Sequence, residues 1–222
     1  MRVLITAGGT EEPLDGVRRL TNSSTGATGL ALARAFADWG AEVVLLHGER
    51  VPVDGLPFET IPFLTFDDLA RALERVLGKR EFDAVIHLAA VSDYRLASME
   101  VDGRAVEISG RGKIGSGHEM LLRLTPNPKL IDSLREWSSN PAVVVVGFKL
   151  TDDPDPAARK ASVDALLKRR AADLVVHNDI REIDGERHLA VIHGQGGPVV
   201  KTGNKNELAG ALLRLLANGE PS

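Results

Sequence analysis

MRVLITAGGT (residues 1–10) opens with a short apolar run, residues 3–6, that leads directly into two glycines. The run is rich in branched aliphatic residues and does not alternate with polar ones. That pattern is typical of a parallel strand that is buried on both faces of a sheet. Four later runs share it, at residues 43–47, 84–90, 142–148 and 174–177. The sequence therefore predicts a mainly parallel sheet.

Helical patterns separate these runs. They cover residues 29–39, closed by Gly40; 66–77, opened by Thr65 and closed by Gly78; 128–137; and 157–170. Alternating strands and helices require right-handed crossovers, which place helices on both faces of the sheet. The predicted fold class is therefore α/β, a Rossmann-like, doubly wound sheet in one domain spanning residues 1–222. Ligands in such folds lie beyond the carboxyl ends of the strands.

Two segments interrupt this alternation. Residues 95–119 contain glycines and mixed charges, and a connection of this length is uncommon in a compact domain unless it binds or covers something. We interpret it as an inserted flap that also supplies a dimer contact. Residues 187–201 predict a β-hairpin. A last helix is expected over 204–216, with Asn204 as its cap and Glu207 three residues later.

Composition bounds the chemistry. Among the 222 residues, 27 lysines and arginines face 31 acids, which gives a net charge of −4, and there is no cysteine. The absent thiols exclude disulfides, iron–sulfur clusters and a cysteine nucleophile. The mild acidity disfavours a nucleic-acid binder. No apolar run approaches the roughly 20 residues that span a membrane, and the N-terminus lacks a signal-peptide pattern, so we expect a cytoplasmic protein without a membrane segment.

Two loops rich in glycine, serine and threonine predict a phosphate cradle. Residues 6–10 follow the first strand, and residues 22–29 open the first long helix. Glycine lets the backbone approach an anion, hydroxyls donate hydrogen bonds, and free N–H groups begin the helix. The alternative is a glycine turn followed by an ordinary Ser/Thr helix cap. Arg18 and Arg19, between the loops, could grip a phosphate or carboxylate, although arginines before a helix are commonly solvated.

Further candidates follow later strands. HLAAVSDYR (residues 87–95) places small residues and Asp93 after a strand, where a sugar or a flat ring can lie on the backbone. We interpret His87 as a core histidine rather than a base. The segment 110–117 sets Lys113 among glycines, which suits either a mobile cation that closes over a phosphate or a plain exposed loop. Phe148 offers an aromatic face to a ligand or belongs to the core. We find no Ser-His-Asp set.

Six motifs together resemble the phosphopantothenate–cysteine ligase family of coenzyme A biosynthesis. They occur in the family's order and cover nearly the whole chain: TAGGTEEPLDGVRRLTNSSTG, HLAAVSDYR, KIGSGHE, PNPKLI, VVGFKLTDD and ADLVVHNDI. The chain is more similar to the stand-alone bacterial ligase than to the ligase half of the fused enzyme. Because the motifs begin at Met1, we expect no flavin-dependent decarboxylase half.

The resemblance implies a two-step reaction. The carboxylate of 4′-phosphopantothenate attacks the α-phosphate of a nucleoside triphosphate, which gives an acyl-nucleotidylate and pyrophosphate. The amine of L-cysteine then attacks the acyl carbon and releases the nucleoside monophosphate. Mg²⁺ is the implied metal, with no ligand assigned, and CTP is favoured over ATP. The resemblance also implies a homodimer whose neighbouring chains contribute to each site.

The resemblance assigns roles to individual residues. Asn22 and Lys113 are the expected catalytic residues, with Asn22 at the acyl phosphate and Lys113 as the flap cation. Arg18 and Ala90, with Asn22, are expected to bind phosphopantothenate. The expected nucleotide-binding residues are Gly8, Gly9, Ser24, Thr25, Gly26, Ala89, Asp93, Asn127, Lys129, Phe148, Lys168 and Arg169.

Two other functions compete with the ligase. A short-chain, nicotinamide-dependent oxidoreductase has a similar fold and an early glycine loop, but it requires a Tyr-x-x-x-Lys pair. Here the single tyrosine, Tyr94, is followed four residues later by Ser98. The second competitor is a nucleotide-binding protein that has kept the fold and lost turnover.

Overall fold

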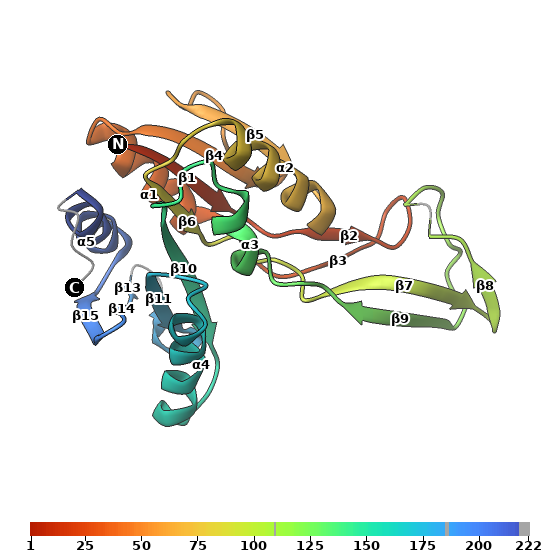
Figure 1. The fold of residues 1–222 in the computed structure, drawn as a ribbon. Coiled ribbons are helices and arrows are strands. Elements are labelled where there is room, and N and C mark those ends of the chain that lie inside the picture. The colour runs from red at the N-terminus through yellow and green to blue at the C-terminus, as the bar shows by residue number, and fades with distance from the viewer. Residues whose placement is uncertain (109, 185–186, 218–222) are drawn as a thin grey trace.

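A central sheet organises the chain in the computed structural model, which describes residues 1–108, 110–184 and 187–217. In these residues the sheet has eight strands (Figure 1), in the order β15 (Gly197–Thr202), β14 (Ala190–Gly194), β11 (Leu174–Asp179), β10 (Val144–Thr151), β6 (Ala84–His87), β1 (Arg2–Ala7), β4 (Glu42–Gly48) and β5 (Glu59–Phe63). The pairings from β11 to β5 are parallel, whereas β14 and β15 join antiparallel. This arrangement confirms the predicted α/β fold class.

The direction of winding reverses beside β1. From β1 the chain crosses to β4 and β5 on one side, and then returns to β6, β10 and β11 on the other. Ile5 of β1 lies opposite Leu45 of β4 and Ile86 of β6, so β1 is central. In an open parallel sheet such a reversal leaves a crevice at the carboxyl ends of the two diverging strands. The fold therefore places a ligand crevice between the ends of β1 and β6.

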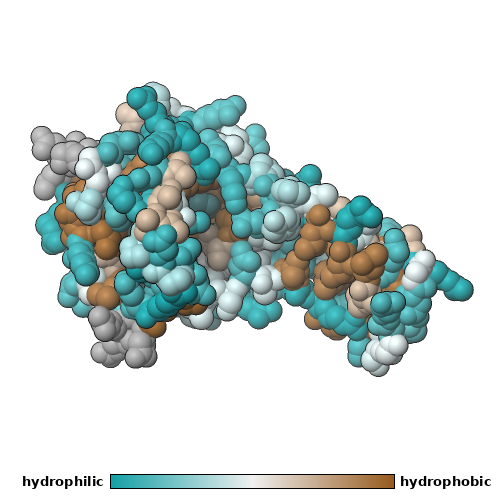
Figure 2. All heavy atoms as spheres, turned by 90° about the horizontal axis from the view of Figure 1, so that it is seen from below, coloured by the Kyte–Doolittle hydropathy of each residue, from teal (hydrophilic) through white to brown (hydrophobic). Residues whose placement is uncertain are grey.

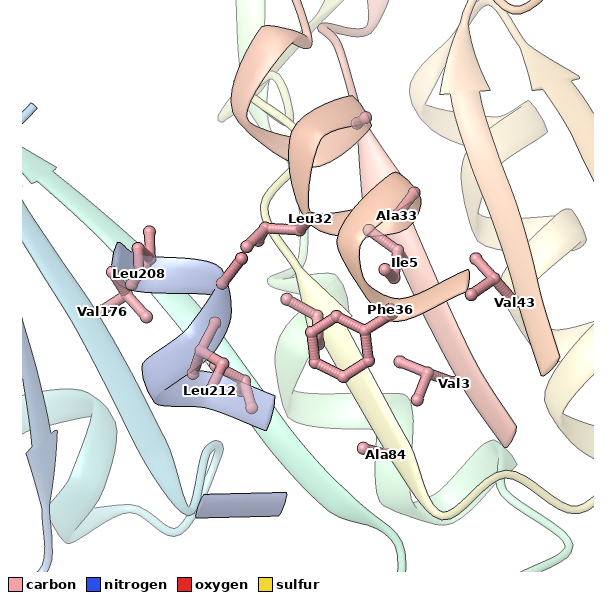
Figure 3. Close-up of a cluster of buried hydrophobic side chains, with 14 of the residues drawn as sticks. Val3, Ile5, Leu32, Ala33, Phe36, Val43, Ala84, Val176, Leu208 and Leu212 are labelled. Atoms are coloured by element: carbon pink, nitrogen blue, oxygen red, sulfur yellow. The ribbon is translucent and has the colours of Figure 1, made fainter. Parts of the chain in front are cut away.

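Helices cover both faces of the sheet. One face carries α1 (Ala27–Asp38) and α5 (Lys205–Ala217), and the other carries α2 (Phe66–Lys79), α3 (Leu130–Trp137) and α4 (Pro156–Lys168). Figure 3 shows Phe36 of α1 and Leu212 of α5 against side chains of the central strands. Phe36 and Leu212 are fully buried. Burial of these faces fixes α1, and with it the loop that precedes the helix, on the sheet.

Helix ends test the sequence rules closely. Gly40 closes α1 as predicted, with a φ of 95° and a hydrogen bond from its N–H to the Ala37 carbonyl. Thr65 caps α2, and its side chain and Asp68 form a reciprocal capping box. The prediction that Gly78 ends this helix is wrong, because α2 continues through Lys79. Gly78 has no left-handed backbone there, so it is an ordinary helical residue.

The C-terminal elements match the sequence in outline. The predicted hairpin is confirmed as β14 and β15. Asn204 precedes α5, and its Oδ1 accepts from the Glu207 N–H at 2.9 Å. The Glu207 carboxylate accepts from the N–H of Gly203 at 2.7 Å, one residue before the expected partner. Short elements connect β11 to this hairpin: a 3-10 turn (Ile180–Glu182), β12 (Ile183–Asp184) and β13 (Arg187–His188).

The predicted flap is strand only in its first part. Its residues 95–101 and 104–106 belong to β7 (Tyr94–Val101) and β8 (Arg104–Val106), which form an antiparallel sheet with β9 (Met120–Pro126), the strand that follows the segment. With the hairpin of β2 (Glu11–Pro13) and β3 (Arg19–Thr21), this sheet forms an arm that projects from the body of the molecule (Figure 1). The glycines of the segment lie in its turns. Among the described residues, no helix is long and apolar enough to cross a membrane.

Candidate active site

Two glycines bring the loop after β1 against the loop before α1. Gly8 and Gly26 have left-handed backbones, with φ of 86° and 70°. A Cβ on Gly26 would lie 2.5 Å from Cγ2 of Val51 and 3.0 Å from the Gly8 nitrogen. A Cβ on Gly8 would lie 2.8 Å from the same Val51 atom. Both the backbone conformation and the space therefore require glycine at these positions.

The start of α1 is open to a ligand. Its N-cap residue is Gly26, and no side chain of the described residues caps the helix. Ser24 Oγ and Thr25 Oγ1 lie 3.4 Å from the N–H groups of Gly26 and Ala27, which is long for a hydrogen bond. The alternative of an ordinary Ser/Thr cap is therefore wrong. The first N–H groups of the helix have no intrahelical acceptor, and together with the helix dipole they favour an anion.

A cavity of about 570 Å³ lies at this helix start, beyond the carboxyl ends of the parallel strands. Phe148, half-buried on β10, lines it opposite the glycine loop. The backbone of residues 88–90, after β6, forms the wall between them. The remaining wall residues are Gly8, Ser23, Ser24, Thr25, Gly26, Ala27, Thr28, Gly29, Lys149, Leu150, Asn178, Ile180, Ile183, His188 and Lys205. This cavity is the crevice that the topology predicts, and we name it the catalytic cleft after its candidate role.

A buried hydrogen-bond network fixes the wall after β6. Thr6 Oγ1 accepts from the N–H groups of Leu88 and Ala89 at 3.1 and 3.0 Å, and lies 3.0 Å from His87 Nδ1. The hydroxyl proton therefore goes to Nδ1, which places the imidazole proton on Nε2. Burial lowers the pKa of His87 to about 4. His87 is thus a neutral core histidine, as predicted, and it holds the Thr6 hydroxyl in place.

This network predicts a loss of stability in acid. The pKa of His87 in the folded protein lies below the ordinary value of 6.5. Its contribution to the unfolding free energy is therefore complete above pH 6.5 and is lost as the pH falls towards 4. The difference of about 2.5 between the pKa values of the unfolded and the folded protein corresponds to about 3 kcal/mol of unfolding free energy. His87→Asn keeps an acceptor for Thr6 and removes the titration. We expect urea unfolding at pH 7 and pH 4 to show a smaller loss for this variant, and equal losses in both proteins would contradict the assignment.

A second cavity, of about 540 Å³, lies on the other side of the loop 22–25. Asn22 lines it, and its Nδ2 donates to the Val91 carbonyl at 3.0 Å. At the back of the cavity, Glu11 is buried between Arg50 and Arg19, at 2.7 and 3.4 Å. The two cavities share Gly8, residues 23–25 and Ala27. A ligand in one cavity therefore meets a ligand in the other across this loop.

Asp93, Asn127 and Lys129 form a neighbouring group rather than part of the cleft wall. Asp93 and Lys129 are exposed and form an ion pair. Asn127 is buried, with its N–H donating to the Asp93 carbonyl at 2.8 Å and its Nδ2 to Ser92 at 3.0 Å. Within the described residues, Asn127 Oδ1 has no hydrogen-bond partner. The structure thus brings these predicted residues together, with Asn127 holding the loop that carries Asp93.

Four predicted site residues lie elsewhere. Arg18 turns to the arm, where it donates to the Ile114 carbonyl at 2.6 Å. Lys113 is exposed on the same segment of the arm and lines neither cavity. Lys168 is the last residue of α4 and Arg169 is its C-cap, and the short connection to the start of β11 at Leu174 places both at the amino edge of the sheet. Arg169 forms an ion pair there with Asp132 at 3.0 Å.

The sequence did not reveal the roles of three residues in or behind the cleft wall. Thr6 sits inside an apolar strand, and nothing in its neighbours marks its hydroxyl as a backbone acceptor. Asn178 and Lys205 join the wall from β11 and α5, which are distant in sequence from the glycine loops. Pairing of β10 with β11 and packing of α5 on α1 bring them there.

Comparison with known proteins agrees with this geometry. Residues 1–219 match the family described as the DNA/pantothenate metabolism flavoprotein C-terminal domain. The chain belongs to this family. It is 33% identical over 194 residues to the coenzyme A biosynthesis bifunctional protein CoaBC of Thermococcus kodakarensis, covering 87% of this chain and 45% of that protein. The chain spans about half the length of the curated relatives it matches.

Solved structures show the same fold. A DNA/pantothenate metabolism flavoprotein from Streptococcus pneumoniae superposes with a TM-score of 0.85 at 28% identity, covering 99% of this chain and 100% of that one. A Cab2 variant in complex with phosphopantothenate-cysteine has a TM-score of 0.73 at 19% identity, covering 100% of this chain and 89% of that one. At that identity the second likeness shows the fold alone.

Proposed function

We propose that this domain is a phosphopantothenate–cysteine ligase that acts through an acyl-nucleotidylate, with CTP preferred to ATP. The observation that carries the proposal is the uncapped start of α1 between two cavities of substrate size, in a chain that belongs to this family. One cavity can hold a nucleotide and the other an acid, with their reacting ends at the shared loop 22–25. The relatives named for coenzyme A biosynthesis support the same assignment.

The catalytic cleft supplies the nucleotide site of the proposal. Phe148 offers a ring to pack against the base, and the backbone at Ala89 and Ala90 offers a flat surface to the nucleoside. The phosphates then lie at Gly8, Gly9 and the start of α1, where N–H groups and the hydroxyls of residues 24 and 25 donate. These donors stabilise the charge that develops when the α-phosphate is attacked.

Asn22 occupies the junction where the acid and the phosphate react. Asn22 begins the shared loop 22–25 and lies beside Gly9 of the loop after β1. A Cβ on Gly9 would stand 2.7 Å from the Asn22 carbonyl oxygen. The carboxylate oxygen forms a bond to the α-phosphorus as the bond to pyrophosphate breaks. In the second step the cysteine nitrogen bonds to the acyl carbon, loses a proton, and the nucleoside monophosphate leaves. Asn22 is proposed to orient the acyl phosphate through both steps.

We propose that Mg²⁺ arrives with the triphosphate. Among the described residues, no group of three or more histidine, aspartate or glutamate side chains is arranged to hold a metal ion. Mg²⁺ needs no such group, because it commonly keeps several waters and binds mainly through substrate phosphates. The ion would offset phosphate charge, while the residues of the loop position the reacting groups.

The arm supports a homodimer. Large apolar side chains are exposed together on the arm, whereas apolar surface residues are ordinarily scattered singly. The exposed fractions are 50% for Tyr94, 37% for Val106, 61% for Leu121 and 39% for Leu124. Figure 2 shows the hydrophobic side chains gathered along the arm. A thin sheet cannot bury this surface by itself. We propose that the arms of two chains pair and deliver Lys113 to the partner's cleft.

The proposal is tested by pyrophosphate release. We expect release that depends on 4′-phosphopantothenate and Mg²⁺, is faster with CTP than with ATP, and continues to phosphopantothenoylcysteine, detected by mass, when L-cysteine is added. Omission of phosphopantothenate is the control for simple hydrolysis. Folded protein that releases no pyrophosphate with either nucleotide would contradict the ligase and favour the nucleotide-binding protein without turnover.

The oxidoreductase alternative receives no support. Its catalytic tyrosine must stand beside the nucleotide, whereas Tyr94 begins β7 of the arm and lines neither cavity. We therefore propose no second function for the cleft.

A further inference from the structure

A separate groove lies on the α4 side of the sheet. It is a cavity of about 540 Å³, bounded by α4 and by the hairpin β14–β15, and we name it the α4 groove. Alternate residues of β14, Ala190 and Ile192, pack towards α5, so Val191 and His193 face the groove. Its volume is close to that of the catalytic cleft. The groove is therefore large enough for a small metabolite and is not used by the proposed reaction.

Positive charge exceeds negative charge along its walls. The cationic lining residues are Arg159, Lys160, Lys168 and Lys201, against the acids Asp164 and Glu182. Lys160 is paired with Asp164 at 2.7 Å. Lys168 and Lys201 form no ion pair with any residue that the structure describes. These two lysines line the groove from different elements, Lys168 from α4 and Lys201 from β15.

Two imidazoles form part of the floor. His177 of β11 and His193 of β14 are half-buried, with ring centroids 6.1 Å apart. The Thr151 hydroxyl donates to Asp179 at 2.7 Å, so it accepts from His177 Nε2 at 2.9 Å. Within the described part of the chain, His177 Nδ1 and both nitrogens of His193 have no hydrogen-bond partner. The groove thus contains three unpartnered ring nitrogens beside two unpaired ammonium groups.

The electrostatic surroundings keep these rings neutral in the absence of an anion. Burial lowers the pKa of both histidines. Around His177, the cations Arg159 of α4 and Lys149 of β10 lower the pKa, and the acids Asp179 and Glu182 raise it. Around His193, Lys160 lowers the pKa, as does His177, and Asp164 raises it. A bound anion would add the negative charge that favours protonation of the rings. Anion binding and ring protonation should therefore strengthen each other.

The hairpin turn leaves the mouth of the groove open, and a hydrogen bond joins the turn to α4. Gln195 and Gly196 form the hairpin turn, and a Cβ on Gly196 or on Gly197, the first residue of β15, would meet nothing within 4 Å among the described residues. Gln195 donates to the Leu167 carbonyl at 3.1 Å, which ties the turn to α4. The opening is thus free of bulky side chains, although the two walls are joined.

We propose that the α4 groove binds a small multivalent phosphate-class oxyanion, held by Lys168 and Lys201 over His177 and His193. The groove is distinct from the catalytic cleft but shares β11 with it, because His177 faces the groove while its neighbour Asn178 lines the cleft. The site is an addition to the ligase reaction and does not depend on it.

Inorganic pyrophosphate is the probe. We expect it to produce saturable shifts in the NMR signals of the His177 and His193 rings, assigned by single His→Asn variants. Binding should tighten as the pH falls from 7.5 to 6. Lys168→Gln/Lys201→Gln should weaken it by roughly tenfold or more, since two charge-assisted contacts are lost. Lys79→Gln/Arg34→Gln, which removes two exposed charges elsewhere, is the matched control and should bind like the wild type.

Three outcomes would overturn the proposal. The first is that the ring signals stay unmoved by millimolar pyrophosphate in protein that the amide spectrum shows to be folded. Shifts that survive in the Lys168/Lys201 double variant would place the anion elsewhere, including the catalytic cleft. Equal or tighter binding of citrate would show that the groove does not select phosphate. None of these readouts depends on ligase turnover, so failure here leaves the proposed function standing.

Discussion

Replacing Gly26 with alanine is expected to reduce ligase turnover by at least about a hundredfold while the protein remains folded. The left-handed backbone at this position costs an L-residue roughly 1–2 kcal/mol. The new Cβ would also stand 3.0 Å from the backbone nitrogen of Gly8 and 2.5 Å from Val51. The two phosphate loops must therefore separate, and misplacement of about 1 Å can cost a factor of about a hundred in rate.

Gly40 provides the matched control for this prediction. It also has a left-handed backbone, with a φ of 95°, but a Cβ there would meet nothing within 4 Å. Gly40→Ala should lose a similar unfolding free energy from backbone strain and keep wild-type turnover, because it lies at the far end of α1. Turnover is measured by pyrophosphate release, and stability by urea unfolding. Full turnover in Gly26→Ala would show that the two loops need not touch for catalysis.

Much of the fold could be predicted because local pattern and tertiary structure agree. Apolar runs such as residues 3–6 became central strands, since only a buried parallel strand tolerates apolar side chains on both faces. β5 was missed because Pro62 interrupts its pattern, and the sheet accepts proline there because β5 is an edge strand. β7 and β8 of the arm were missed because polar residues stand on both faces of each strand, which leaves little apolar alternation to detect.

The site was predictable where its parts stand together in short glycine-rich segments. Gly8, Gly26 and the hydroxyls between them belong to two glycine-rich segments, and the crossover from β1 to α1 brings these together. Lys168 was misplaced because a basic helix end carries no information about which edge of the sheet it reaches. The helix α4 runs antiparallel to the strands, so its last turn reaches the edge away from the cleft. The role of the Thr6 hydroxyl as a backbone acceptor could not be predicted, since it depends on β6 lying beside β1.

Lys113→Ala and Asn22→Ala are each expected to reduce turnover by about a hundredfold or more, and a mixture of the two inactive proteins is expected to regain activity. Lys113 lies between Gly112, whose carbonyl accepts from the Gly16 N–H at 2.7 Å, and Ile114, which Arg18 holds. These contacts fix the Lys113 segment to the arm, which projects away from its own cleft (Figure 1). If Lys113 acts on the activated acid, it must therefore act in a partner chain.

Restored activity follows from the arithmetic of mixing. Random exchange of equal amounts makes about half of the dimers heterodimers, and in each of these one cleft has both its own Asn22 and the partner's Lys113. About a quarter of wild-type turnover should return after exchange, as measured by pyrophosphate release. Two Lys113→Ala samples mixed together are the control and should stay inactive. If Lys113 serves its own cleft instead, one cleft of the heterodimer lacks the lysine and the other lacks the asparagine. Mixing the single variants would then restore nothing, because each chain carries one defect in its own cleft.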